Sequence, residues 1–254
     1  NNSELFAPAK IIGNKKELLP LMMNKLNVYN YLKSKGLKYI ETVPLKRWKE
    51  IVEKYNFPVI VKPVVGTGGS KGVFIVADEK ELSLFRKNFK QEIFCVQPFI
   101  GSENDEYTVG VLNDKDGNLI DSIVMKRKLI GLSLLSSKAI NNKTYSISTG
   151  YSQGYIIKNK KIQSFCEKLA TDLGSVGPLN IQLRVDKNDI YVFEIHPRFS
   201  GTTPIRTDVG FNEVDILLRN HLYKEKFGRL NYQYNVAAIR AFQHVIIPIN
   251  KMKK

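Results

Sequence analysis

The sequence predicts an α+β protein with two unequal subdomains, and three observations lead to this fold class. First, helical periodicity and short β-branched runs alternate over residues 20–97. Second, longer alternating strands joined by short turns follow Pro98. Third, 43% of the 254 residues are hydrophobic, which is enough for a buried core. We therefore expect a linker over residues 1–19, a small subdomain over 20–97 and a large subdomain over 98–254.

Each element of the small subdomain has a local signal. Apolar residues at helical spacing predict two helices, and Asp78 is a candidate N-cap for a third. Short extended runs rich in valine, isoleucine and phenylalanine predict the strands. The predicted helices cover 22–35, 46–55 and 79–88, and the predicted strands cover 39–43, 59–61, 73–76 and 93–97.

The large subdomain is predicted to consist mainly of hairpins. Alternating apolar residues beside turn residues predict the strands, and apolar stripes predict the helices. The strands cover 106–112 with 118–128, 179–185 with 189–195, and 236–245, and the helices cover 161–173 and 213–221. Residues 129–148 are rich in serine and asparagine, so we expect a mobile loop over a site.

Composition narrows the classes of partner. The net charge of +15, from 39 Lys and Arg against 24 Asp and Glu, favours anionic ligands such as nucleotides. The lysines are scattered and no nucleic-acid-binding motif occurs, which disfavours nucleic acid as a partner. No apolar run reaches the roughly 20 residues that span a bilayer, and the beginning of the sequence has no signal-peptide pattern. With only Cys95 and Cys166, a disulfide scaffold is not indicated, and we expect a cytoplasmic protein with no membrane partner.

A glycine-rich loop lies between two short strands within residues 58–77. Its glycines are Gly66, Gly68, Gly69 and Gly72. Glycine lets backbone N–H groups approach an anion closely, and Lys62 adds a positive charge at the end of the first strand. The loop lacks the Walker spacing and no helix follows it, so the pattern favours a lid over a nucleotide. An ordinary hairpin turn with a solvated lysine is the alternative.

The hairpin over residues 179–195 carries the sharpest chemical signal. Glu194 and His196 are two apart on one strand and therefore share a face, and Gln182 can reach them from the paired strand. Carboxylate and amide oxygens suit Mg²⁺, whereas imidazole is a less usual ligand, so His196 is a direct or an outer-shell partner. Arg198 offers a fork of donors for phosphate or carboxylate. A surface hairpin with a solvated glutamate and a loop arginine is the alternative.

Two further charged positions fall on the strands that precede this hairpin. Glu106 is a candidate for binding ribose hydroxyls, although a charged strand start would look the same. Lys126, Arg127 and Lys128 alternate between the two faces of the sheet, so one or two of them are candidates for facing phosphates.

Taken together, the motifs resemble the ATP-grasp superfamily. They run K-P-x-x-G-x-G-G-S-x-G-V, V-Q-P-F-I-G, E-Y-T-V-G-V-L, N-I-Q-L and F-E-I-H-P-R-F-S-G, in that order. The sequence looks most like the ATP-grasp modules of carbamoyl phosphate synthase large subunits and their stand-alone relatives, over about residues 20–210. The resemblance implies ATP held between two α+β subdomains.

The resemblance also implies roles for individual residues. Lys25 and Lys62 would contact phosphates, and the flexible loop at Gly68, Gly69 and Ser70 would close over them. The adenine would be read by the backbone of Gln97, Pro98, Phe99 and Ile100, and the ribose by Glu106. Gln182 and Glu194 would bind Mg²⁺ or Mn²⁺, with His196 standing where the family usually has Asn. Arg198 would contact the reacting phosphate or acyl phosphate, and Lys126 and Arg127 remain catalytic candidates from the strand pattern alone.

The chemistry implied by the resemblance is a two-step ligation. A carboxylate attacks the γ-phosphate of ATP to give an acyl phosphate, and an amine or ammonia then displaces phosphate. The expected partners are small carboxylates and amines. Many relatives also carry an N-terminal Rossmann-like domain, which would here sit on another chain, belong to a missing segment, or be lacking in this protein. The alternatives are a phosphorylating module that needs a second domain or subunit, like that of carbamoyl phosphate synthase, a catalytically silent nucleotide-binding module, and a basic nucleic-acid binder.

Overall fold

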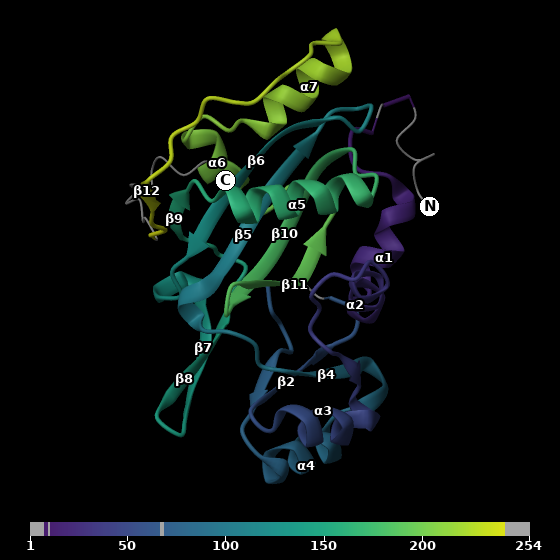
Figure 1. Cartoon of the computed structure of the whole chain (residues 1–254), viewed down its shortest axis with the longest axis vertical. Helices are drawn as coiled ribbons and strands as arrows, with labels where there is room; N and C mark the ends of the chain where they lie inside the picture. Colours follow the sequence, from purple (N-terminus) through teal and green to yellow (C-terminus); the bar gives the residue numbers. More distant parts are fainter. Residues whose placement is uncertain (1–7, 10, 67–68, 242–254) are drawn as a thin grey trace, which may run out of the picture.

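Two antiparallel sheets form the two ends of the molecule in Figure 1, where the computed structural model describes residues 8–9, 11–66 and 69–241. Within these residues, the larger sheet has six strands in the order β11-β10-β5-β6-β9-β12 and the smaller has four in the order β1-β4-β2-β3. A two-stranded ribbon, β7-β8, extends from the larger sheet toward the smaller one. The α+β fold class expected from the sequence is confirmed.

The larger sheet follows the predicted hairpins. Its strands are β5 (Glu106–Asn113), β6 (Leu119–Arg127), β9 (Gly154–Ile157), β10 (Gly177–Asp186), β11 (Asp189–His196) and β12 (Val236–Ala238). Strand β9 was not predicted, and of the strand expected over 236–245 the structure describes β12, while residues 242–245 lie outside the described part.

Helices cover both faces of the larger sheet because its strands alternate apolar residues to each side. Helix α5 (Lys160–Asp172) packs on one face, where Val109 and Val111 of β5 are fully buried. Helix α7 (Glu213–Tyr223) packs on the other, against Leu112. The short helix α6 (Thr203–Asp208), which was not predicted, lies beside α7. The period of two along β5 therefore serves two cores.

The smaller sheet has its own apolar core. Its strands are β1 (Val43–Pro44), β2 (Val59–Pro63), β3 (Phe74–Val76) and β4 (Phe94–Pro98), and its helices are α3 (Trp48–Tyr55) and α4 (Glu79–Asn88). The core includes Ile51 of α3, Val59 of β2 and Leu82 of α4, all with no exposed surface. Helix α4 begins as predicted, because the Asp78 side chain accepts a hydrogen bond from the Glu81 N–H at 2.8 Å.

The helix predicted over residues 22–35 is instead two helices, α1 (Leu19–Met23) and α2 (Lys25–Ser34). Asn24 interrupts them with an extended backbone, and its side chain caps α2 by accepting from the Leu26 N–H at 3.0 Å. Buried residues of α2 pack with the core of the larger sheet. The subdomain boundaries expected at residues 20 and 98 remain predictions, and α2 packs against β11 of the larger sheet.

The prediction of a mobile loop over residues 129–148 is wrong. These residues form the ribbon of β7 (Leu134–Ile140) and β8 (Lys143–Ser148). Asn141 and Asn142 make the two-residue turn, with φ values of 48° and 62°. Asparagine tolerates this left-handed conformation, and turns of this kind match the twist of paired strands. Short 3₁₀ helices occur at Lys16–Leu18, Leu45–Arg47, Gln91–Ile93, Glu103–Asp105 and Gly131–Ser133.

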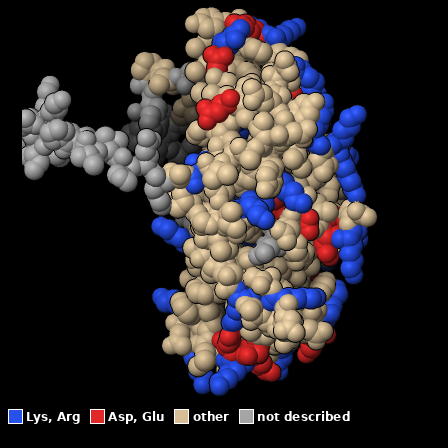
Figure 2. All heavy atoms as spheres, turned by 90° about the vertical axis from the view of Figure 1, so that its left-hand side faces the viewer, with Lys and Arg blue, Asp and Glu red and all other residues tan. Residues whose placement is uncertain are grey.

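Basic side chains are spread over the surface and do not form one block. Figure 2 shows Lys and Arg from one end of this face to the other, with Asp and Glu between them. Within the described residues, no helix combines the length and the apolar character that crossing a membrane requires.

Candidate active site

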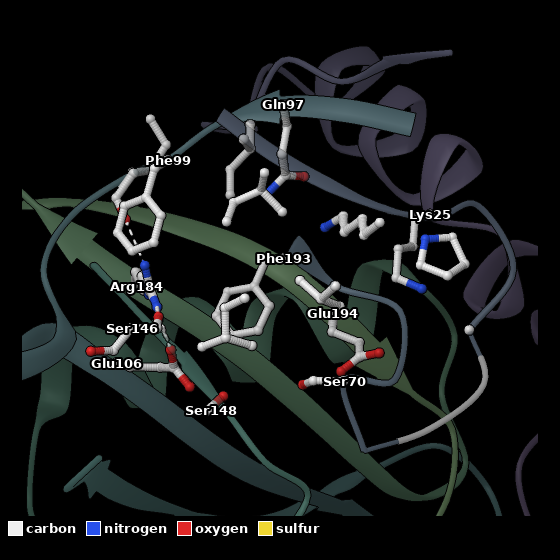
Figure 3. Close-up of a pocket in the computed structure, with 18 of the residues that line it drawn as sticks. Lys25, Ser70, Gln97, Phe99, Glu106, Ser146, Ser148, Arg184, Phe193 and Glu194 are labelled. Atoms are coloured by element: carbon white, nitrogen blue, oxygen red, sulfur yellow. Dashed lines mark hydrogen bonds and ion pairs between the residues drawn. The ribbon is translucent and has the colours of Figure 1, made fainter. Parts of the chain in front are cut away.

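A cavity, here called the first cavity, lies between the two sheets and takes side chains from both (Figure 3). One end carries Lys25 and Glu194 with Ser70, and the other carries the Phe99 ring beside the paired Glu106 and Arg184. Most of the residues predicted to bind nucleotide line it: Lys25, Lys62, Ser70, Gln97, Pro98, Phe99, Ile100 and Glu106. A ligand with a flat ring and a charged tail would fit this polarity.

Lys62 is held deep in the first cavity by a tyrosine. It lies on β2 and is 5% exposed, and its Nζ donates to the Tyr29 hydroxyl at 2.6 Å. That hydroxyl in turn donates to the Phe193 carbonyl at 3.0 Å. Burial lowers the pKa of Lys62 to about 8. The lysine is therefore held by the Tyr29 hydroxyl rather than by an ion pair, and an anion in the cavity could neutralise its charge.

The glycine-rich loop bends back toward Lys25. A side chain at Gly66 would come within 3.2 Å of the Lys25 Nζ, so glycine permits the lysine to approach the loop. Gly69 and Ser70 have φ values of 61° and 59°, which is strained for serine and allowed for glycine. Gly68 lies outside the described residues.

Glu106 is paired with two arginines. It is 1% exposed, and it accepts from Arg127 Nη1 at 2.9 Å and from Arg184 Nη2 at 2.8 Å, one through each carboxylate oxygen. Burial raises the pKa of Glu106, but the charges of Arg184 and Arg127 outweigh this effect and hold it below its usual value. Both oxygens are thus engaged, so a ribose hydroxyl would have to share or displace an arginine.

The β7–β8 ribbon closes the ring-bearing end of the first cavity. Tyr145 of β8 meets the Phe99 ring edge-on at a centroid distance of 4.9 Å, and the Arg184 guanidinium lies 4.5 Å from the Phe99 centroid. The Ser146 carbonyl accepts from Arg184 Nη2 at 3.0 Å. Lys138 near the ribbon tip pairs with Glu81 of α4 at 2.5 Å. The segment predicted as a loop therefore forms a wall that connects both subdomains.

A second cavity adjoins the first on the larger sheet, and Glu194 lines both. The residues lining it are polar or glycine: Gly69, Thr108, Thr149, Gly150, Ser152, Asn180, Gln182, Glu194, His196, Arg198, Ser200, Gly201 and Thr202. Arg198 is exposed, and its Nη1 donates to the Phe199 carbonyl at 2.7 Å. The guanidinium retains donors for an anionic ligand.

The register of β10 and β11 brings the predicted metal ligands together. Gln182 lies opposite Glu194, and His196 follows on the same face. His196 Nε2 is 3.1 Å from a Glu194 oxygen. Burial raises the pKa of Glu194, but the His196 hydrogen bond and the charges of Lys25 and Lys62 bring it below its usual value. Glu194 is thus ionised at neutral pH and faces both cavities.

The donor set fits a hard cation. Glu194 and Gln182 offer the oxygen ligands that Mg²⁺ prefers, and the cavities leave space for its water molecules. No group of three or more His, Cys, Asp or Glu among the described residues could hold a metal ion.

Lys126 and Arg127 occupy opposite faces of β6, and neither lines a cavity. Lys126 lies opposite Tyr107, on the face covered by α5, and its Nζ is 3.6 Å from Asp105. Arg127 lies on the site face but is buried beneath the first cavity by Glu106. A one-residue step along the strand reverses the face, and a phosphate contact by Lys126 or Arg127 stays a prediction.

Sequence reasoning missed several residues of the site. Arg184 stands two residues after Gln182 on the same face of β10, and this spacing could have revealed it. Asn180 stands two before, and its oxygen accepts from Thr108 at 3.0 Å and from Arg206 of α6 at 2.8 Å. The loop residues of the second cavity carried no periodic signal.

Comparison with known proteins places this architecture in a family. The model of the ATP-grasp domain matches residues 22–202. Carbamoyl phosphate synthase large chains are similar in sequence: the Clostridium botulinum (strain Loch Maree) protein is 28% identical over 210 residues, covering 81% of this chain and 18% of its own length. The Thermoplasma volcanium protein is 29% identical over 241 residues, covering 86% of this chain and 22% of its own. This chain thus spans about a fifth of these relatives.

Solved structures share the fold at lower identity. N5-carboxyaminoimidazole ribonucleotide synthetase from Thermotoga maritima is 19% identical with a TM-score of 0.58, over 87% of this chain and 54% of its own. The biotin carboxylase domain of Hydrogenobacter thermophilus 2-oxoglutarate carboxylase, in complex with MgADP, ADP and bicarbonate, is 18% identical with a TM-score of 0.57, over 78% of this chain and 44% of its own. Since the family match covers most of the sequence, this chain belongs to the ATP-grasp family.

Proposed function

We propose that this chain binds ATP with Mg²⁺ in the first cavity and uses it to activate a small carboxylate in the second, for attack by an amine or ammonia. The observation that carries the proposal is the position of Glu194, which lines both cavities. Lys25 and Lys62 lie on its nucleotide side and Arg198 on the other. A phosphoryl group could pass between the cavities at this point.

The polarity of the first cavity orients the nucleotide. Its triphosphate would lie at the end with Lys25 and Lys62, under the loop at Gly69 and Ser70. Its base would lie at the other end, against Phe99 and the backbone from Gln97 to Ile100. Glu106, which is held by two arginines, would support the ribose end.

Magnesium would be held by Glu194 and Gln182, with His196 as a partner of Glu194. When bound, it supplies neutralisation of the negative charge on the phosphates. Lys62 and Arg198 would supply positive charge on either side of the reacting group, and the buried Lys62 is already held in place by Tyr29.

In the reaction, a carboxylate oxygen bonds to the γ-phosphorus of ATP. The bond between this phosphorus and the oxygen that bridges the β- and γ-phosphates breaks, giving an acyl phosphate and ADP. An amine nitrogen then bonds to the acyl carbon and orthophosphate leaves. Arg198 would orient the carboxylate, and the loop at Gly69 would keep water from the acyl phosphate. Bicarbonate is a first candidate, because a biotin carboxylase domain with this fold binds it.

This chain matches about a fifth of the length of its carbamoyl phosphate synthase relatives, so it would supply only part of their activity. We therefore propose that a further domain or subunit completes the amine site. This agrees with the alternative of a phosphorylating module that needs a second domain or subunit. The dispersed basic residues favour a nucleotide over nucleic acid as the anionic partner. Cys95 and Cys166 are buried free thiols, which supports a reducing, cytoplasmic setting.

Carboxylate-dependent release of ADP tests the proposal. Purified protein with Mg-ATP is assayed against a panel of bicarbonate, small amino acids and hydroxy acids, with and without ammonia. We expect at least one carboxylate to stimulate ADP release. Binding of ATP with no stimulated release by any carboxylate would favour the silent module.

Glu194→Gln provides the matched residue test. Removing the charge shared by the two cavities should lower ADP release at least ~100-fold with the circular dichroism spectrum unchanged. Glu50→Gln, on the exposed side of α3, is the control and should leave release unchanged. Full activity in Glu194→Gln would remove this residue from the proposed metal site.

A further inference from the structure

The last described segment of the chain reaches the wall of the second cavity. Strand β12 pairs with β9, and Arg240 follows two residues after it. The Arg240 N–H donates to the Gln153 side chain at 3.0 Å. The family match ends at residue 202, so this contact comes from outside the matched region.

The Arg240 guanidinium joins two loops that both line the second cavity. Its Nε donates to the Ser152 carbonyl at 2.9 Å, and its Nη2 donates to the Gly201 carbonyl. Ser152 and Gly201 belong to the loops before β9 and before α6. One planar side chain therefore connects two walls of the second cavity that are 49 positions apart in the sequence.

The backbones of these loops lie close together at their glycines. A methyl group at Gly201 would come within 3.1 Å of the Gly150 carbonyl oxygen. A methyl group at Gly150 would come within 3.4 Å of the Gly69 Cα, in the glycine-rich loop. Three glycines from three loops thus line the second cavity, and the close approach of Gly201 to Gly150 leaves little room between its two walls.

We propose that Arg240 is a positioning residue that holds the two walls of the second cavity together. The inference rests on the proposed function for its kinetic consequence and on the contacts alone for its structural one. Arg240 does not line the cavity, so it acts through Ser152 and Gly201. Its effect should fall on the carboxylate and spare the nucleotide, whose cavity contains none of these three residues.

Arginine suits this task because two donors in one rigid plane can serve two carbonyls at once. A lysine at this position has one ammonium on a flexible stem and would serve one carbonyl well. Arg240→Lys should therefore recover only part of the effect of Arg240→Ala. Arg219→Ala is the matched control, because Arg219 pairs with Asp215 and Glu225 on the exposed side of α7.

The kinetic test measures ADP release against bicarbonate, or against whichever panel carboxylate gives turnover. Losing two hydrogen bonds should raise the carboxylate KM about tenfold in Arg240→Ala, with the ATP KM and kcat within about twofold of the parent. Arg240→Lys should lie between the two, and added guanidinium should partly restore Arg240→Ala. An unchanged carboxylate KM, or equal changes in the ATP and carboxylate KM values, would overturn the proposal.

Hydrogen exchange decides the structural part without any turnover. Amides of residues 150–153 and 200–202 should exchange faster in Arg240→Ala than in Arg219→Ala, with the strands of the larger sheet unchanged. Equal exchange in both variants would overturn the proposal. If the parent protein shows no carboxylate-dependent release, the proposed function fails, and the exchange result still decides whether Arg240 holds the walls.

Discussion

The two cavities share Glu194 but are built in different ways. The first is lined mainly by side chains on strands, and two of its charged groups are buried and held: Lys62 by Tyr29, and Glu106 by Arg127 and Arg184. The second is lined mainly by loop residues with hydroxyl groups or no side chain, and Arg198 there is exposed. The first is fixed by the fold, and the second is fixed by the positions of loops.

This difference suits two tasks: the first cavity would bind the nucleotide, and the second would select the carboxylate substrate. Burial of a charge is costly unless it is paired, so the groups of the first cavity require the network around them. Substitutions in loops such as residues 149–153 leave the sheets intact, so loop sequence can adapt the second cavity to different ligands on one scaffold. Changes in the first cavity should therefore affect stability, and changes in the second should affect substrate use.

Glu106→Gln should produce the largest effect on stability. It would leave Arg127 buried without its charge partner, and breaking such a pair costs about 3–5 kcal/mol. Urea unfolding measures the change, and Asp116→Asn, in an exposed pair, should cost less than ~0.5 kcal/mol. A loss below ~1 kcal/mol for Glu106→Gln would mean that the network is not essential to the fold.

Lys62→Met should separate function from stability. Removing a buried charge without an ionic partner should raise the free energy of unfolding by about 1–3 kcal/mol. The same change should weaken ATP binding at least ~10-fold, since a phosphate contact is lost. Calorimetric titration and urea unfolding measure the two effects. An unaltered ATP dissociation constant would count against the phosphate role.

The pH dependence of the parent protein sharpens this point. The folded pKa of Lys62 is about 8, below the ordinary 10.5 of the unfolded chain. Lys62 therefore loses its proton first in the folded state, so its contribution to stability rises between pH 8 and 10.5. ATP affinity should fall over the same range, because the neutral amine no longer attracts phosphate. Lys62→Met should lack both trends, and their persistence would assign them to another group.

Lys126→Ala should have the smallest effect. Its side chain lies on the α5 face of β6, next to Asp105 and outside both cavities. We expect ATP affinity and carboxylate-dependent release within about twofold of the parent, and stability within ~0.5 kcal/mol. A loss of turnover greater than tenfold would show that this face takes part in the reaction.

The sequence predicted strand-borne groups better than loop-borne ones, for a physical reason. Alternation along a strand places Gln182 and Glu194 on one face wherever the hairpin forms. Alternation alone does not say which face of β6 points toward the cavities, so it could not choose between Lys126 and Arg127. The β7–β8 ribbon was missed because its composition resembles a loop, although Asn141-Asn142 between two alternating runs is a hairpin signal. Arg240 and the three glycines meet only through tertiary contacts, which no local pattern encodes.

The central claim is that both subdomains hold one nucleotide, with Lys62 and Glu194 on its phosphates. A crystal structure of the protein with Mg-ADP tests this most directly. The account predicts density for the diphosphate between Lys62 and Glu194, with the base against Phe99. Nucleotide bound at another surface, with the first cavity filled only by water, would contradict it.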